Sequence, residues 1–239
     1  MSMMETTTGT RGELPERTIA EKAYRLLRED ILSGDLGPGL KLKIEMLRQR
    51  YGLGAAPIRE ALARLSSDHL VRLEGQRGCE VVPMSIEEAG DIGRMRKMLE
   101  VEALKTSIAQ GGEDWETDLV AAFHRLESLE RRTNQGIDEL SEWEQRNHRF
   151  HAALVAACGS PWLMRLRQTV FDQHERYRRL SRVKTVRTRD ISREHRELME
   201  AALARDVDKA ARVMEAHVQG TTDAVIAALT AKFPGGIGR

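Results

Sequence analysis

The sequence contains few cysteines and no long apolar run. Cys79 and Cys158 are far apart, and neither has a Cys or His partner at zinc-finger spacing, so neither a disulfide framework nor a cysteine-type zinc site is indicated. No uncharged stretch approaches the roughly 18 apolar residues that span a bilayer, and the first residues are polar. We therefore expect no membrane span, no signal peptide and a cytoplasmic location.

The net charge is close to zero, and aromatic residues are scarce. Lys and Arg number 38 against 37 Asp and Glu, so bulk charge gives no argument for nucleic-acid binding, and any such binding needs a local patch. The stretch 43–77 has a modest basic excess of this kind. Because aromatics make up 4% of the chain, we expect a core built mainly from Leu, Ala, Val, Met and Ile.

The length favours two domains, since single domains usually run to about 100–150 residues. Residues 1–17 lack apolar periodicity and are interpreted as a flexible arm, and 233–239 as a flexible tail. Between them we expect a DNA-binding domain over 18–83 and a helical domain over 84–232. Pro83, followed by Ser85 as a helix cap, marks the boundary.

The first domain has the pattern of a winged helix-turn-helix. An amphipathic helix starting at Thr18 and ending near Gly34 is followed by a short helix from about Ile44 to Tyr51, a glycine turn at 52–54 and a second short helix. Residues 70–73 and 79–82 are strand candidates around a hairpin at 74–78, which would be the wing.

The second domain is predicted to be all-helical, because apolar residues recur at spacings of three and four. Glycine-rich and polar interruptions divide it into six predicted helices, at about 86–109, 114–132, 138–157, 161–180, 189–204 and 206–230. The predicted fold class is therefore mostly α, with a winged helix-turn-helix followed by a six-helix bundle.

The segment from Ala56 to Leu62, Ala-Pro-Ile-Arg-Glu-Ala-Leu, is a distinctive motif on the second short helix. With Tyr51-Gly-Leu53 before it and His69-Leu-Val71 and Gly78 after it, it resembles the winged-helix domain of the GntR family of bacterial transcription regulators. The resemblance implies that Arg59 points from the recognition helix into the major groove of operator DNA. Many relatives have a hydroxyl residue, Arg and Thr before the Pro, whereas this chain has Gly54, Ala55 and Ala56.

Arginine suits such a position because its planar fork donates two hydrogen bonds to guanine O6 and N7. Other basic residues of the domain are interpreted as phosphate contacts, which position the protein without reading sequence. Taken alone, Arg59 would equally suit a solvated helix face. The predicted DNA-binding set is Arg59, Arg48, Arg50, Arg64, Arg77 and Gly78.

Four polar residues interrupt the apolar faces of the helical domain. Asn147 and His151 are an i, i+4 pair on one helix, and His195 and His217 lie among apolar residues of the last two helices. Imidazoles that converge in a bundle core are good ligands for Zn²⁺ and similar ions. Each His taken singly would more simply be a hydrogen-bonded core residue.

This domain resembles the FCD ligand-sensing domain of the FadR subfamily. In metal-binding members, an Asp or Asn precedes a His by four residues and two further His follow, a pattern that Asn147, His151, His195 and His217 match. The resemblance implies a divalent metal, with Zn as the first choice. Asn147 stands where many relatives have Asp, which removes one negative charge.

Arg96 and Glu100 correspond to an Arg and a Glu on the first helix of such domains. Arg96 would then pair with the carboxylate of a small organic acid effector, although an internal ion pair with Glu100 is an equal alternative. Tyr177 is a second predicted effector-binding residue. His124, His148 and His174 fall outside the metal set and are interpreted as surface or packing residues, although His174 shares a helix face with Tyr177 that would line the cavity.

Segments such as Leu42-Lys-Ile-Glu45 and Gly75-Gln-Arg-Gly78 resemble the branch of the carbon-starvation regulator CsiR, which implies a dicarboxylate effector such as glutarate. The predicted function is a homodimeric repressor, released from DNA by the effector. One alternative is a helical metal-dependent hydrolase built on His151, His195 and His217, although no HExxH and no placed general base are present. A protein-binding scaffold is the other alternative.

Overall fold

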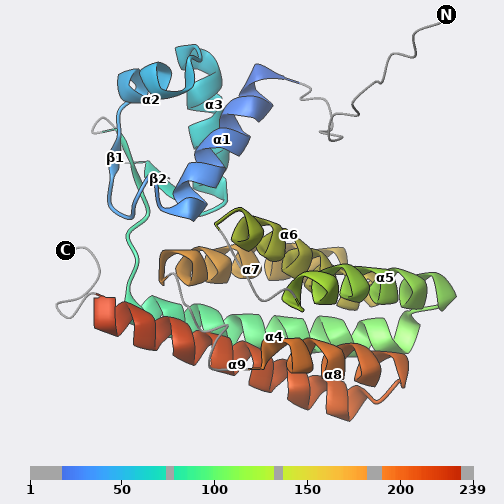
Figure 1. The fold of residues 1–239 in the computed structure, drawn as a ribbon. Coiled ribbons are helices and arrows are strands. Elements are labelled where there is room, and N and C mark those ends of the chain that lie inside the picture. Colours follow the sequence, from blue (N-terminus) through green and yellow to red (C-terminus); the bar gives the residue numbers. More distant parts are fainter. Residues whose placement is uncertain (1–17, 74–77, 132–136, 182–189, 233–239) are drawn as a thin grey trace, which may run out of the picture. The chain divides into compact units, whose positions relative to one another are not determined.

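The computed structural model of the chain describes residues 18–73, 78–131, 137–181 and 190–232 (Figure 1). Contacts divide the chain into two compact units, one drawn from 1–31 and 40–82 and the other from 32–39 and 83–239. We call them the winged unit and the helical unit. The predicted arm, tail and hairpin tip at 74–77 lie outside the described residues, and the domain limits stay a prediction.

The winged unit combines short helices with a small sheet. Its elements are α1 (Ile19–Ser33), β1 (Lys41–Leu42), α2 (Ile44–Tyr51), α3 (Ala55–Ser67), β2 (Val71–Leu73) and β3 (Cys79–Val81). The strands form an antiparallel sheet in the order β1-β3-β2, with Leu42 and Leu73 both opposite Cys79. β1 was not predicted, because two residues are too few to show an alternating pattern.

Local sequence explains the ends of these helices. The Thr18 hydroxyl accepts a hydrogen bond from the Glu21 amide at 3.0 Å and caps α1. Gly52 ends α2 in the left-handed conformation at φ 66°, which glycine adopts without a Cβ clash. Ala23, Leu47 and Ile58 are fully buried, one from each helix, so each of the three helices contributes to the apolar interior of the winged unit.

The helical unit contains six long helices among its described residues. They are α4 (Ile86–Gln110), α5 (Glu113–Glu130), α6 (Ile137–Leu154), α7 (Pro161–Ser181), α8 (Ile191–Leu203) and α9 (Val207–Lys232). A short 3₁₀ turn, Ala156–Cys158, follows α6. α4 begins at the predicted cap, where the Ser85 hydroxyl accepts a hydrogen bond from the Glu88 amide at 3.0 Å.

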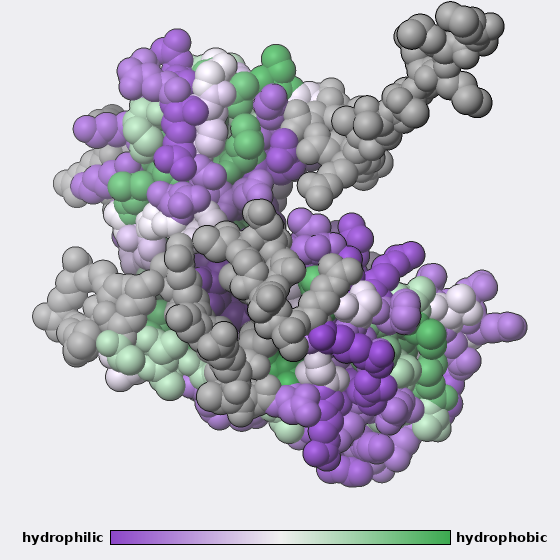
Figure 2. All heavy atoms as spheres, viewed as in Figure 1, coloured by the Kyte–Doolittle hydropathy of each residue, from purple (hydrophilic) through white to green (hydrophobic). Residues whose placement is uncertain are grey.

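α4 is the central helix of this unit, since it packs along α9 and also against α7 (Figure 1). The main core joins residues of α4, α5, α6, α8 and α9, among them the fully buried Leu104, Leu119 and Phe150. Hydrophilic residues dominate the visible surface of the described chain (Figure 2). No described helix combines the length and the apolar character needed to cross a membrane.

The predicted fold class is confirmed: a winged helix-turn-helix precedes a helical domain. The predicted helix limits differ from the observed ones by a few residues, as at α6, where the last predicted turn is the separate 3₁₀ segment. Fraying and 3₁₀ ends make such offsets usual.

Candidate functional site

α3 presents the predicted recognition residue. Ile58, Ala61, Leu62 and Leu65 form the buried face of this helix. Arg59 lies next to that face and is exposed, and no hydrogen bond or ion pair ties it to another residue in the part of the chain that the structure describes. Its guanidinium is therefore available for a base edge.

The other described arginines of the predicted set are engaged in ion pairs. Arg48 pairs with Glu45 at 2.8 Å, and Arg50 pairs with Asp30 at 2.6 Å. Arg64 lies 3.6 Å from Glu21. Exposed pairs of this kind contribute roughly 0–1 kcal/mol, so a DNA phosphate can compete for each guanidinium.

Gly78 directly precedes β3 with φ at 102°, a conformation that L side chains rarely adopt. This angle is consistent with the hairpin that the sequence predicts at 74–78, which requires a glycine at its end. A DNA contact of Gly78 stays a prediction, and Arg77 lies outside the described residues.

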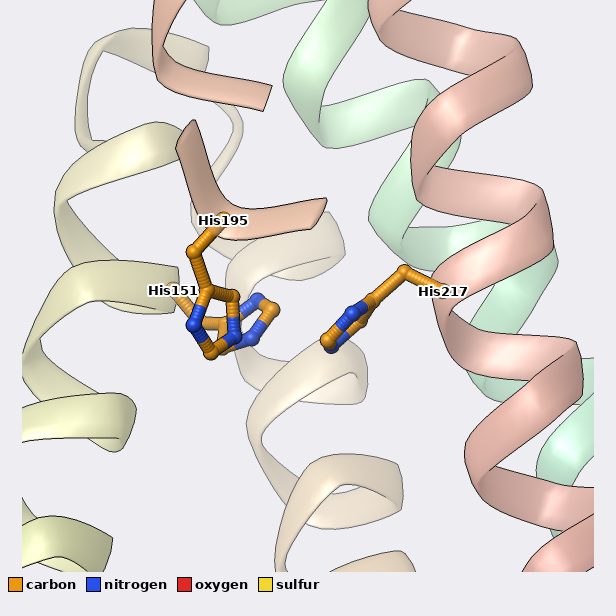
Figure 3. A group of neighbouring side chains, drawn as sticks. All are labelled: His151, His195 and His217. Atoms are coloured by element: carbon orange, nitrogen blue, oxygen red, sulfur yellow. The ribbon is translucent and has the colours of Figure 1, made fainter. Parts of the chain in front are cut away.

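Three histidines meet in the helical unit. His151 of α6, His195 of α8 and His217 of α9 are all buried, and each offers a ring nitrogen within 4.8 Å of the others'. Their ring centroids are 5.0–5.6 Å apart, and the three side chains point toward one another (Figure 3). We call them the histidine cluster. The structure thus brings together three residues of the predicted metal set.

Two of these rings have a carboxylate within hydrogen-bond distance of Nδ1. Nδ1 of His195 lies 3.0 Å from Glu130, and Nδ1 of His217 lies 2.8 Å from Glu194. Such partners fix the tautomer so that Nε2 carries the lone pair. Neither acid is predictable from the sequence, because helical periodicity does not reveal which residues of distant helices meet.

Glu130 is anchored by further donors. One of its oxygens also accepts a hydrogen bond from Trp143 Nε1 at 3.0 Å, and the other accepts one from the Ser192 hydroxyl at 2.8 Å. Burial raises the pKa of this carboxyl. The hydrogen bonds and the neighbouring His195 together lower the pKa by more than burial raises it, so the net shift is downward. Glu130 is therefore a charged, fixed acceptor.

Several nitrogen and oxygen atoms of the predicted metal set have no hydrogen-bond partner within the described residues. They are both ring nitrogens of His151, Nε2 of His195 and Oδ1 of Asn147. Burial lowers the pKa of His151 well below its usual value and that of His217 to about 4, so these imidazoles are neutral near pH 7. Neutral nitrogens and an amide oxygen left unbonded in a core fit a divalent metal ion.

Two buried arginines lie beside the cluster. Arg167 Nε donates to Glu100 at 2.8 Å, whereas Arg96 Nε lies 3.6 Å from the other oxygen of Glu100 without a hydrogen bond. Both guanidinium groups and the His151 ring border the Phe171 ring, at 4.4, 5.3 and 6.1 Å respectively. The predicted ion pair between Arg96 and Glu100 is thus present, but its atoms are farther apart than those of the pair between Arg167 and the same carboxylate.

Tyr177 is the second predicted effector residue, and its effector role stays a prediction. It packs in a separate apolar cluster with Met84 and Val225, and its hydroxyl accepts from the Ser85 amide at 3.0 Å and donates to Glu88. Its described contacts are therefore those of a structural anchor for the start of α4.

The three histidines outside the predicted metal set differ in environment. His124 is exposed, and His148 packs edge-on against Phe171 at 5.0 Å, as expected for surface and packing residues. His174 is buried and hydrogen-bonded to Arg96. The position of His174 on the same helix face as Tyr177 was the one sequence signal that indicated a place near the predicted effector site.

Comparison with known proteins places both units. Residues 19–81 match the family described as bacterial regulatory proteins, gntR family, and residues 91–220 match the FCD domain. The chain is 37% identical over 210 residues to the uncharacterized HTH-type transcriptional regulator BphR of Paraburkholderia xenovorans, covering 87% of this chain and 86% of that one.

Two further similarities agree. The chain is 38% identical over 199 residues to the HTH-type transcriptional repressor GlaR of Escherichia coli, covering 82% of this chain and 90% of that one. A crystal structure of a GntR family transcriptional regulator from Pseudomonas syringae pv. tomato covers 92% of this chain and 91% of its own, with a TM-score of 0.52 and 28% identity.

These families and relatives are transcription regulators, which removes the hydrolase alternative. The exposed guanidinium on α3 also agrees with a role on DNA. The chain therefore belongs to the GntR family of bacterial transcription regulators, with an FCD domain after its DNA-binding domain, and is a DNA-binding regulator and not an enzyme.

Proposed function

We propose that this regulator is a repressor whose helical unit binds a divalent metal ion, with Zn²⁺ as the first choice, together with a small carboxylate effector that releases the DNA. Asn147, His151, His195 and His217 would hold the ion. Arg96 would bind the carboxylate. The observation that carries the proposal is the meeting of three buried imidazoles, several of whose ring nitrogens have no hydrogen-bond partner among the described residues.

The donor set favours a metal over a plain packing role. A hydrogen-bonded core histidine uses its nitrogens, yet neither nitrogen of His151 has a described partner, and such unsatisfied groups are costly in a core. Glu130 and Glu194 hold the far sides of the other two rings. A bound divalent ion would supply open coordination positions for carboxylate oxygens.

The surplus of buried positive charge favours an anionic effector. Arg96 and Arg167 are 5% and 2% exposed and share one close carboxylate, Glu100. Burial lowers the pKa of Arg96 to about 10, against the opposing charge of Glu100, so the group remains charged near pH 7. A carboxylate from outside the chain would balance that charge.

Arg59 supports the DNA-reading part of the proposal. A bidentate contact with guanine discriminates by roughly 1–3 kcal/mol, and the structure leaves this side chain exposed for it. We propose that two copies of the chain bind a near-palindromic operator, one recognition helix for each half-site. Exposed apolar side chains on α4 and α7, such as Met98 and Trp162, are candidates for the contact between copies.

Coupling between effector and DNA requires that the effector bind more tightly to the DNA-free arrangement than to the DNA-bound one. Arg96, which would contact the effector, sits on the same helix as Glu100, which binds Arg167 next to His151. The effector site and the metal site therefore share one set of buried contacts, and we expect metal and anion to bind cooperatively.

A zinc titration of the full chain, freed of metal by chelation, tests the proposal. We expect about one equivalent of Zn²⁺ by elemental analysis and a rise in melting temperature, because a ligand that binds the native state stabilises it. His195→Ala should lose both, whereas His124→Ala, which replaces an exposed histidine, should keep both. Unchanged zinc content in His195→Ala would overturn the ligand set.

The second arm of the test measures DNA release. Fluorescence anisotropy of the chain on DNA from upstream of its own gene should show release by glutarate and other short dicarboxylates, with a scrambled duplex as control. If that DNA is not retained specifically at low salt, where phosphate contacts are strongest, the proposal that this region contains an operator is contradicted. Retention without release by any carboxylate would contradict the effector class.

A further inference from the structure

A buried chain of hydrogen bonds lies outside the histidine cluster. Nδ1 of His174 on α7 is 2.8 Å from Arg96 Nη1 on α4. Nε2 of the same ring is 3.0 Å from the Thr222 hydroxyl on α9. All three side chains are at most 5% exposed, so the chain joins three helices through the interior of the unit.

The chemistry of the three groups fixes the direction of each hydrogen bond. A guanidinium has N–H groups and no acceptor, so His174 Nδ1 must accept from Arg96. Nε2 then carries the ring hydrogen and donates to Thr222. The Thr222 hydroxyl in turn donates to the Val218 carbonyl at 2.9 Å. His174 is thus a neutral imidazole in one defined tautomer, and its burial beside Arg96 keeps its pKa well below the usual value.

Gly93 on α4 permits the contact of Thr222 with His174. A Cβ at position 93 would lie 2.5 Å from both the hydroxyl and the methyl group of Thr222, closer than real Cβ contacts allow. A glycine therefore lets α9 approach α4 closely enough for Thr222 to reach the His174 ring. A larger residue would push the hydroxyl away.

The same contacts leave one edge of Arg96 unsatisfied. His174 holds Nη1, and the Phe171 ring covers one face with its centroid 4.4 Å from the guanidinium carbon. Nε has no hydrogen-bond partner among the described residues, and the nearest carboxylate, Glu100, lies 3.6 Å from it and also binds Arg167. The guanidinium is fixed at one edge and one face, with N–H capacity left over.

We propose that His174 is a positioning residue of the effector site: by accepting from Arg96, it orients the guanidinium so that its unsatisfied edge meets a bound carboxylate, with Thr222 fixing the ring tautomer. This role rests on the proposed function, in which Arg96 binds an organic acid. It makes His174 a determinant of anion affinity that is separate from the metal ligands.

Two substitutions of His174 separate positioning from packing. In His174→Asn the amide oxygen occupies nearly the place of Nδ1 and can still accept from Arg96, whereas in His174→Leu no acceptor remains. Thr222→Val removes the hydroxyl and keeps the shape. Each full-length variant is titrated with glutarate, with butyrate as the monocarboxylate probe, and separately with Zn²⁺, and melting temperature and zinc content are recorded.

For His174→Leu we expect a loss of glutarate affinity of about tenfold or more, as for the loss of a hydrogen bond to a charged group, with the zinc response unchanged. His174→Asn should stay within about threefold of the parent chain, and Thr222→Val should fall between the two. A purely structural role would lower both the zinc and the glutarate responses and would not be rescued by Asn.

The outcomes distinguish this role from the proposed function. If the parent chain responds to zinc but to neither carboxylate, the effector part of the proposed function fails, and the role of His174 fails with it. If the parent chain responds to glutarate and His174→Leu responds equally, the role of His174 alone is overturned. Equal loss in the Asn and Leu variants would also overturn it, because the retained acceptor would then be irrelevant.

Discussion

The two units bury different kinds of side chains. Among the described residues of the winged unit, Glu80 is the one buried charged side chain, and Arg48, Arg50, Arg59 and Arg64 lie near or at the surface. The helical unit instead buries Arg96, Glu100 and three clustered histidines. The winged unit has its candidate functional side chains at the surface, around an apolar core. The helical unit has its candidate functional side chains buried in the core.

This difference implies that the stability of only one unit depends strongly on protons and ligands. Buried ionisable groups link folding to pH, and a ligand of the native state links folding to its own concentration. The three tryptophans of the chain, Trp115, Trp143 and Trp162, all belong to the helical unit. Tryptophan fluorescence therefore reports the unfolding of that unit separately.

The largest expected effect is the loss of stability of the metal-free helical unit in acid. Burial lowers the pKa of His217 to about 4 in the folded chain, against about 6.5 when unfolded. Between these values the unfolded state binds more protons, so the free energy of unfolding falls as pH drops from about 6.5 to about 4. His217 alone accounts for about 3 kcal/mol.

Urea unfolding of the chelator-treated chain, followed by tryptophan fluorescence at several pH values, measures this loss. His217→Gln removes the titrating group and should flatten the dependence on pH. A tryptophan-detected transition that does not move between pH 7 and pH 4 would show that the buried histidines do not distinguish the two units.

Next in size is the effect of Arg59→Ala on the winged unit. Loss of a bidentate base contact should weaken binding to the specific site by about 5- to 150-fold and leave binding to random DNA nearly unchanged. Arg48→Ala, which removes a predicted phosphate contact, should weaken both and lower the salt dependence. Anisotropy titrations on the two duplexes decide, and equal losses for Arg59→Ala would make it a phosphate contact.

A smaller effect is expected from Glu130→Gln in the helical unit. The amide cannot replace the charged acceptor of His195 Nδ1, and the loss of such a supporting group typically lowers metal affinity about 10- to 100-fold. DNA binding by the metal-free chain should be unchanged. Glu197→Gln, which breaks an exposed pair with Arg193 on the same helix as His195, is the control. Similar zinc affinities for the two variants would argue against a supporting role.

The smallest effect is expected from Ser85→Ala at the start of α4. Removal of the cap should lower the stability of the helical unit by about 1 kcal/mol, seen in the tryptophan-detected transition. Ser67→Ala, at the end of α3 in the winged unit, should leave that transition in place. A shift of the same size in both variants would mean that the two units do not unfold separately.

Much of the fold was predictable because each helix carries its own periodic pattern. The predicted cap at Ser85 and the glycine turn after Tyr51 are both present, since these are local interactions within a few residues. β1 was missed because its two residues pair with a strand 37 positions away, and no local pattern records such pairing.

The site was predictable in part. The spacing of Asn147 and His151 and the apolar surroundings of His195 predicted residues that point inward, and three of the four predicted ligands are shown to converge. The acids behind them were not predictable, because the separation of Glu130 from His195 is 65 residues and the helices meet only in the folded core. The same reason explains why the sequence predicts only a surface or packing role for His174.

One oxygen atom of Glu130 accepts hydrogen bonds from both the Trp143 indole and the His195 imidazole. This shared atom places a natural chromophore two hydrogen bonds from the histidine cluster. An ion with a partly filled d shell, such as Co²⁺, would quench that emission by energy transfer over so short a path, whereas Zn²⁺ with its filled shell would not. If the proposed site binds Co²⁺, the emission of Trp143 would therefore report its occupancy without an attached dye.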